Sequence, residues 1–251
     1  MKTGVLILHG FTGGSFEVRP FIRYVKEQTD WMIDVPVLPG HEPGGRLTKI
    51  TAEAWLMEAE IAYKRLKKRT DRIMVVGFSM GGLIAMYLAL RYPIEKLVLL
   101  SAAAKYISPR LLLADAAVLL AEPIIRNFPP NTFYHLYRYK LANTPIRSAF
   151  QFTRIVRQVQ PYYGMITVPV CIVQGKQDGI VPFSSAQLLY ESLGSLEKTL
   201  IFSDKGKHHI CYSDDCAQWF EKVLSFMQIT DKHVLFDSEY IGCDNAGVVV
   251  E

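Results

Sequence analysis

The segment covering residues 73–82 constrains the fold more than any other part of the chain. Residues 73–76 form a short apolar run rich in β-branched side chains, which predicts a buried strand, and residues 83–90 continue with a helical pattern. Between them, Gly77-Phe78-Ser79-Met80-Gly81 matches the pattern G-x-S-x-G. A strand that turns directly into a helix bends sharply, which strains the serine backbone and requires small neighbours. The pattern therefore predicts that Ser79 projects from the carboxyl edge of a sheet as a nucleophile; the alternative is a glycine-rich turn with a solvated serine.

The size and composition of the chain predict one large core with an insertion. The chain has 251 residues, of which 50% are hydrophobic, and α/β folds commonly reach this size as single domains. Its formal charge of +4 gives no basic excess that would argue for a nucleic-acid partner. A basic cluster at residues 64–69 falls where a helix is expected to end, and favourable helix-dipole interactions explain it. A membrane-surface role for this cluster is the weaker alternative.

The cysteines and the first residues favour a cytoplasmic protein. The four cysteines, Cys171, Cys211, Cys216 and Cys243, show neither C-x-x-C pairing nor the density of a disulfide scaffold, so reduced thiols are expected. The apolar run at residues 4–8 is too short for a secretory signal, and no stretch has the apolar length of a membrane span. The sequence also lacks H-E-x-x-H, and we expect neither a metal nor a cofactor.

A glycine-rich loop follows the first predicted strand, Val5–Leu8. This loop reads His9-Gly10-Phe11-Thr12-Gly13-Gly14, and a helix capped by Ser15 is expected to run to about Gln28. Backbone N–H groups in such a loop can bind a nucleotide phosphate or the oxyanion of an acyl-transfer intermediate. The loop matches neither the Walker motif nor G-x-G-x-x-G, so an oxyanion hole fits better, with the amides of Phe11 and Met80 as donors. We expect His9 to be structural.

Strands alternate with helices along most of the chain, which predicts an α/β fold with a mainly parallel sheet. Further strands are expected at residues 32–37, 97–100, 168–173 and 199–202, with helices beginning near Thr51, Ser184 and Asp214. Residues 105–167 contain helical patterns and prolines but no strand candidate, so they are expected to form a helical cap over the carboxyl edge. Some of the apolar side chains of this cap are expected to line an acyl-sized pocket.

Two later loops carry a candidate acid and a candidate base. Asp178 follows the strand expected at residues 168–173, although Asp-Gly is also a common turn. His208 and His209 follow the strand expected at residues 199–202, and we favour His208 over its neighbour. An esterase needs a nucleophile, a base and a buried carboxylate, and Ser79, Asp178 and His208 occur in the order nucleophile, acid, histidine. Weaker candidates are Ser101, Asp204, His233 and the loop histidine His41.

Four motifs together resemble the α/β-hydrolase superfamily, and within it the small bacterial carboxylesterases and related monoacylglycerol lipases. They are His9-Gly10-Phe11-Thr12-Gly13, Gly77-Phe78-Ser79-Met80-Gly81-Gly82, Gln174-Gly175-x-x-Asp178-x-x-Val181-Pro182 and Gly206-Lys207-His208-His209-Ile210. The resemblance implies Ser79, Asp178 and His208 as a catalytic triad, Phe11 and Met80 as oxyanion-hole donors, and a helical cap that receives the acyl chain. It also implies a sheet of about six to seven strands flanked by helices.

The chain departs from the family pattern at both ends. It begins directly with the strand that normally comes third, so the sheet is expected to be smaller, and residues 229–251 match nothing in the family. We therefore expect an α/β-hydrolase core at residues 1–104 and 168–228, the cap insertion at 105–167 and a tail at 229–251.

The leading functional prediction is a serine hydrolase that cleaves carboxylic esters of short-to-medium acyl chains through an acyl-enzyme on Ser79. This is a carboxylesterase, with monoacylglycerols among the substrates considered. The alternatives are a thioesterase, an amidase or a lactonase with the same triad, and a non-catalytic ligand-binding protein on a hydrolase scaffold. The expected partner is a small-molecule ester, without nucleic acid and without stable membrane insertion; the oligomeric state is not predicted.

Overall fold

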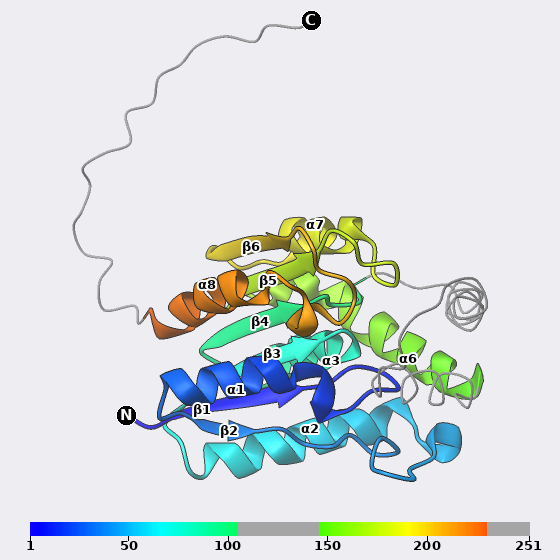
Figure 1. Ribbon diagram of the computed structural model, residues 1–251. Coiled ribbons are helices and arrows are strands. Elements are labelled where there is room, and N and C mark those ends of the chain that lie inside the picture. Colours follow the sequence, from blue (N-terminus) through cyan, green and yellow to red (C-terminus); the bar gives the residue numbers. More distant parts are fainter. Residues whose placement is uncertain (105–145, 230–251) are drawn as a thin grey trace, which may run out of the picture.

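The protein is built around a six-stranded, fully parallel β-sheet. The computed structural model describes residues 1–104 and 146–229 (Figure 1). The strand order is β2-β1-β3-β4-β5-β6, and every neighbouring pair is parallel. The strands are β1 (Thr3–Leu8), β2 (Met32–Asp34), β3 (Arg72–Phe78), β4 (Lys96–Leu100), β5 (Val170–Gly175) and β6 (Lys198–Ser203). The predicted α/β class and the parallel sheet are confirmed.

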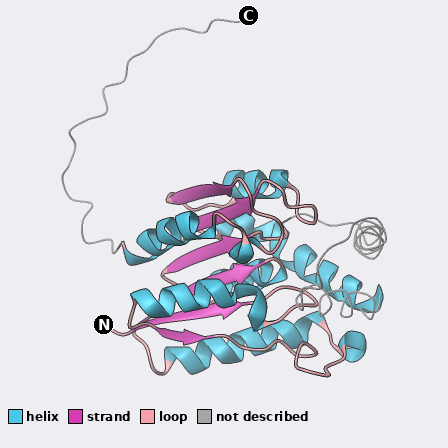
Figure 2. Ribbon diagram, viewed as in Figure 1, coloured by secondary structure: helices cyan, strands magenta, loops and turns pink. Residues whose placement is uncertain are grey.

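Helices cover both faces of the sheet, giving three layers (Figure 2). Alternate residues of the central strands enter two different core clusters, as the period of a β-strand requires. One cluster joins the sheet to α2 (Ala52–Lys67), α3 (Met80–Arg91), α6 (Ile146–Val159) and α7 (Phe183–Ser192). The other joins it to α1 (Arg19–Gln28) and α8 (Cys216–Gln228). Because β1, β3, β4 and β5 are covered on both sides, their sequences are continuous apolar runs rather than alternating ones.

The strand order places a reversal of direction between β1 and β3. The chain leaves β1 for the edge strand β2, then returns past β1 to β3 and continues outward to β6. In open α/β sheets, ligands bind at the carboxyl ends of the strands where the order reverses. The loops after β1 and β3 therefore lie where a ligand-binding site is expected.

Two predicted elements differ from the structure, and a proline accompanies each difference. The helix expected from Ser15 is instead a 3-10 turn, η1 (Ser15–Val18), followed by α1. Pro20 lies in the first turn of α1, where its missing N–H is tolerated, so a new helix starts there. The strand expected at residues 32–37 ends at Asp34, two residues before Pro36, which cannot donate to a ladder. By contrast, α2 begins after Thr51 as predicted, and the Thr51 side chain accepts from the amide of Ala54.

The predicted insertion and tail lie partly outside the described residues. Positions 105–145 and 230–251 are in this group, and with them His233 and Cys243. The described remainder of the insertion is α6 and the 3-10 helix η3 (Gln160–Met165), and α6 packs against α3 in the main core. The proposed division into core, cap and tail therefore stays a prediction.

Two further expectations can be checked within residues 1–104 and 146–229. No helix in this part of the chain is long and apolar enough to cross a membrane. Cys171, Cys211 and Cys216 are free thiols.

Candidate active site

Ser79 lies at a strained corner between β3 and α3. Strand β3 ends at Phe78 and α3 begins at Met80, so Ser79 alone makes the turn. Its φ of 52° and ψ of −115° belong to a region that non-glycine residues rarely adopt, at a cost of about 1–3 kcal/mol. The Ser79 amide donates to the carbonyl of Leu100 at 3.0 Å, which helps to hold the strained residue in place. The serine therefore has the position that the G-x-S-x-G pattern predicts.

The glycines around Ser79 are required by close backbone approach. A Cβ atom on Gly77 would lie 2.3 Å from the carbonyl oxygen of Gly81. A Cβ atom on Gly81 would lie 2.3 Å from the carbonyl oxygen of Leu8 in β1. Both contacts are with backbone, which cannot move aside cheaply. The pattern thus brings α3 close to both β3 and β1.

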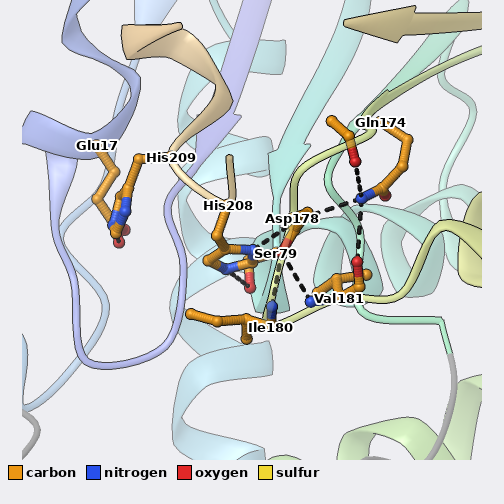
Figure 3. Close-up of polar contacts among 9 residues, drawn as sticks. Glu17, Ser79, Gln174, Asp178, Ile180, Val181, His208 and His209 are labelled. Carbon is orange, nitrogen blue, oxygen red and sulfur yellow. Dashed lines mark hydrogen bonds and ion pairs between the residues drawn. The ribbon is translucent and has the colours of Figure 1, made fainter. Parts of the chain in front are cut away.

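A continuous hydrogen-bonded line joins Ser79, His208 and Asp178 (Figure 3). Ser79 Oγ is 3.1 Å from His208 Nε2, and His208 Nδ1 is 3.0 Å from Asp178 Oδ2. The three residues come from the loops after β3, β6 and β5, all at the carboxyl edge of the sheet. Although 129 positions separate Ser79 from His208 in the sequence, the fold brings their side chains into contact.

The Asp178 carboxylate is buried but fully engaged. Its Oδ1 accepts from the amides of Ile180 and Val181, each at 2.9 Å, and its Oδ2 accepts from Gln174 Nε2 at 3.2 Å. Burial raises the pKa of Asp178, but the charge and hydrogen bond of His208, together with the two amides, lower it by more. The pKa therefore lies below its ordinary value. Asp178 is therefore ionised at neutral pH. An ionised Asp178 places the hydrogen of His208 on Nδ1, which leaves Nε2 to accept from the Ser79 hydroxyl.

The competing candidates lie elsewhere. His209 turns away from Ser79 and faces Glu17, with its Nε2 3.4 Å from Glu17 Oε1 (Figure 3). Asp204 forms an exposed ion pair with Lys176. The hydroxyl of Ser101 is fully buried in the loop after β4. Among the candidates that lie within residues 1–104 and 146–229, His208 and Asp178 meet Ser79 in a line.

The loop after β1 is held by His9 in a defined orientation. The amide of Leu38 donates to His9 Nε2 at 3.0 Å, so the hydrogen of His9 is on Nδ1, which donates to the carbonyl of Gly10 at 2.9 Å. That carbonyl and the Phe11 amide belong to one planar trans peptide, so they point in opposite directions. Fixing the carbonyl of Gly10 therefore fixes the direction of the Phe11 N–H. His9 is structural, as predicted.

The amides on either side of Phe11 are also fixed by buried side chains. The Gly10 amide donates to Glu17 Oε2 at 2.9 Å, and the Thr12 amide donates to His41 Nε2 at 3.2 Å. Burial is the main reason that the pKa of His41 falls to about 4, so this imidazole is neutral at pH 7 and able to accept. The sequence analysis treated His41 as a loop residue and missed Glu17. The sequence does contain a signal for Glu17: it is an acidic residue four positions before the buried Phe21, on a helical face that should be apolar.

The second predicted donor, Met80, is the first residue of α3. The amides of a helix's first turn have no partner within the helix, so the Met80 amide is available at the positive end of α3. Such N-terminal amides favour a developing negative charge. The arrangement can therefore activate a hydroxyl on one side and stabilise an anion on the other.

An aromatic surface adjoins the Phe11 loop. The ring of Phe11 packs against Trp55 of α2 and Phe152 of α6, each at a centroid distance of 5.8 Å. Trp55 and Phe152 are buried, and Phe11 is partly exposed. The helix α6 therefore contributes to the apolar surroundings of the site. In the described part of the chain, no group of three or more His, Cys, Asp or Glu residues is arranged to hold a metal ion.

The chain is similar in sequence to several known hydrolases. The family model described as serine aminopeptidase, S33, matches residues 39–215. A thermostable monoacylglycerol lipase of Bacillus sp. (strain H-257) is 28% identical over 231 residues, covering 89% of each chain. A carboxylesterase of Bacillus subtilis (strain 168) is 24% identical, covering 90% of this chain and 93% of its own.

Solved structures show the same fold. One is described by the work on LipS and LipT, two metagenome-derived lipolytic enzymes; it has a TM-score of 0.70 and 24% identity and covers 90% of this chain and 93% of its own. The monoacylglycerol lipase of Paleococcus ferrophilus has a TM-score of 0.68 and 18% identity, covering 89% and 93%. The family model spans more than half of the chain, so this protein belongs to the serine aminopeptidase S33 family and is an α/β-hydrolase.

Proposed function

We propose that this protein is a serine carboxylesterase that cleaves carboxylic esters of short-to-medium acyl chains, monoacylglycerols among them, through an acyl-enzyme on Ser79. The observation that carries the proposal is the line from Ser79 Oγ through His208 to Asp178, at 3.1 and 3.0 Å. The relatives named monoacylglycerol lipase and carboxylesterase support ester hydrolysis as the reaction.

The first half of the reaction would acylate the serine. Ser79 Oγ attacks the ester carbonyl carbon while His208 Nε2 takes the hydroxyl proton. The Asp178 carboxylate stabilises the resulting imidazolium. His208 then gives this proton to the leaving alkoxy oxygen, so the C–O bond of the ester breaks and the free alcohol departs.

The second half would release the acid. His208 takes a proton from water as the water oxygen attacks the acyl carbon, and it returns this proton to Ser79 Oγ when the acyl–serine bond breaks. The products are a carboxylic acid and the restored hydroxyl. In both halves the carbonyl oxygen becomes an oxyanion that accepts from the amides of Phe11 and Met80. Removing one such donor costs about 10²–10³-fold in kcat in comparable enzymes.

The surroundings of the site favour an apolar acyl group and a neutral substrate. The partly exposed ring of Phe11, backed by the buried rings of Trp55 and Phe152, offers an apolar surface beside the proposed oxyanion hole. We place the acyl chain against this surface, under a cap formed by residues 105–167, with the core at 1–104 and 168–228. Within residues 1–104 and 146–229, the two carboxylates beside the site, Asp178 and Glu17, are both engaged by amides and a histidine, which leaves neither to bind a free substrate ammonium group. A neutral ester therefore fits better than the amino-terminal peptide implied by the family's name.

The test is hydrolysis of a chain-length series of 4-nitrophenyl esters, from acetate to palmitate, together with monoacylglycerols. We expect the highest kcat/KM with butyrate to octanoate, and Ser79→Ala should abolish turnover. A fluorophosphonate should label wild-type protein at Ser79 and leave Ser79→Ala unlabelled.

Three results would contradict the proposal. Absent turnover together with absent labelling would favour a non-catalytic ligand-binding protein. Faster turnover of matched thioesters or lactones would reassign the substrate class while keeping the same side chains. An unchanged rate in Ser79→Ala would remove Ser79 as the nucleophile.

A further inference from the structure

The buried Glu17 and the partly buried His209 form a pair beside the line of Ser79, His208 and Asp178. They lie on the opposite side of His208 from Asp178 and take no part in the proposed proton path (Figure 3). Glu17 is on η1, behind the loop that carries Phe11, and His209 directly follows His208. The pair therefore connects the loop of Phe11 to the loop of His208, and the proposed reaction requires these two loops to be correctly aligned.

The Glu17 carboxylate fills the inside of the Phe11 loop. Its Oε2 accepts from the amides of Gly10 at 2.9 Å and Gly14 at 3.2 Å, at the two ends of the turn. A Cβ atom on Gly13 would lie 1.9 Å from the same oxygen, so the loop is wrapped closely around the carboxylate. The Glu17 residue is 2% exposed. Any shift of this carboxylate would move the peptide between His9 and Gly10, which leads into the peptide that carries the Phe11 amide.

The other carboxylate oxygen faces the histidine loop. Glu17 Oε1 is 3.4 Å from His209 Nε2. The ring of Phe78, which precedes Ser79, packs against His208 at 5.1 Å and His209 at 5.9 Å between centroids. A movement of His209 would therefore be transmitted to His208 both through the backbone and through this ring.

We propose that Glu17 and His209 are a positioning pair that aligns the Phe11 amide and the His208 imidazole with the hydroxyl of Ser79. One face of the Glu17 carboxylate orients the peptides leading to Phe11, and the other holds the residue after His208. This inference deepens the carboxylesterase function proposed above and rests on it.

Charge explains why the acid has a histidine opposite it. Burial raises the pKa of Glu17, but the hydrogen bond and charge of His209, together with His9 and the Gly10 amide, lower it below its ordinary value. Glu17 is therefore an anion at neutral pH. It accepts from the amide of Gly10, and the next amide along the chain, that of Phe11, must stabilise the oxyanion of the reaction. His209 and the two backbone amides offset this charge, because an uncompensated buried carboxylate is costly.

The same two segments are joined by a second contact that does not touch the carboxylate. The hydroxyl of Tyr212, in the 3-10 helix η4 (Ile210–Tyr212), donates to the carbonyl of Phe16 at 2.6 Å. Tyr212→Phe removes this link between η1 and η4 and leaves Glu17 and His209 in place. It is therefore the matched control for a general loosening of the two loops.

The experiment compares Glu17→Gln, His209→Gln, the double variant and Tyr212→Phe with wild type on 4-nitrophenyl butyrate. Glutamine keeps the length of Glu17 but removes its charge and one acceptor oxygen. If the remaining oxygen accepts from Gly10 and Gly14, an NH2 group replaces the carboxylate oxygen that faces His209. We expect each single variant to lose about tenfold or more in kcat, with KM within about twofold, because the lost alignment acts on the transition state. The double variant should lose no more than the worse single variant, since the two residues act as one unit.

Thermal unfolding of every variant separates positioning from folding. If Glu17→Gln does not fold, Glu17→Asp is the second variant, which keeps the charge on a shorter side chain that cannot reach both loops; the same loss in kcat is expected. Three outcomes would contradict the positioning role of Glu17 and His209. They are an unchanged kcat in the single variants, losses in kcat that multiply in the double variant, and an equal loss in kcat in Tyr212→Phe. Wild-type protein that neither turns over esters nor takes up a fluorophosphonate would overturn the proposed function itself, and this inference with it.

Discussion

At the scale of single residues, the site depends on which atom of each imidazole carries the hydrogen. His9 and His41 each accept a backbone amide at Nε2, from Leu38 and Thr12 respectively. His208 has the same arrangement, since Asp178 takes the hydrogen on Nδ1 and Nε2 faces Ser79. In each case a fixed neighbour selects the tautomer, so the direction of every hydrogen bond around Ser79 is determined by the fold.

Asp178→Asn tests this dependence directly. An asparagine can donate to Nδ1 and so place the imidazole hydrogen on Nε2, where it cannot accept the Ser79 proton. We expect kcat to fall by about 10³–10⁴-fold, as for the equivalent change in a serine protease. Steady-state kinetics with 4-nitrophenyl butyrate measure the loss. Glu191→Gln, the same acid-to-amide change at an exposed position of α7, is the control that should retain activity. A loss of less than tenfold in Asp178→Asn would remove Asp178 from the proposed triad.

At the scale of elements, a buried lysine joins β4 to the end of α8. Lys96 is 2% exposed, and its Nζ donates to the carbonyl oxygens of Phe226 and Ile229. These carbonyls belong to the last turn of α8 and its cap, where the helix dipole favours a positive charge. Lys96 thereby closes a helix end that packs on the α1 face of the sheet.

Lys96→Met should lower the free energy of unfolding by about 1–3 kcal/mol, because buried carbonyl oxygens lose a donor. Urea unfolding measures the change, and esterase kcat should stay the same because Lys96 is remote from Ser79 along the sheet. Lys64→Met is the control. Lys64 is exposed and forms a long ion pair of 3.8 Å with Glu60, so its loss should change the free energy of unfolding by less than about 0.5 kcal/mol. Equal stability of both variants would contradict the assigned role of Lys96.

Elements also show why some sequence predictions succeeded. The strands β3, β4 and β5 each contain a continuous apolar run of four residues, and these runs locate the strands without any tertiary information. The elbow at Ser79 is equally local, because its glycines are dictated by contacts with β1 and within the turn itself. The end of β2 and the break between η1 and α1 were missed, although Pro36 and Pro20 marked both positions.

At the scale of the whole molecule, the sequence order of Ser79, Asp178 and His208 predicted which loops meet, because a parallel sheet brings all its carboxyl ends to one edge. The choice between His208 and His209 could not follow from order alone, since adjacent residues share a loop. It is decided by the position of η1, which presents Glu17 to His209. Side-chain partners from distant segments are thus the part of the site that periodicity does not reveal.

Global stability should depend on pH through His41. Its pKa is about 4 in the folded protein against 6.5 for an ordinary histidine, so below pH 6.5 the unfolded chain binds a proton that the folded chain does not. Stability then rises with pH between about 4 and 6.5, and each unit of acidification in this window costs up to about 1.4 kcal/mol. His41→Gln should flatten this slope in urea unfolding followed from pH 7 to pH 5. Identical slopes for wild type and variant would contradict the assignment.

The 129 positions between the Ser79 hydroxyl and the His208 imidazole have a consequence for biosynthesis. A growing polypeptide contains its serine elbow early, but the base is added only with the loop after β6, which comes last along the sequence among the described strands. Contacts between residues so distant along the chain slow folding, because the long loop between them must first be closed. An incomplete or half-folded polypeptide would therefore leave cellular esters intact, and ester cleavage would report that the entire sheet has assembled.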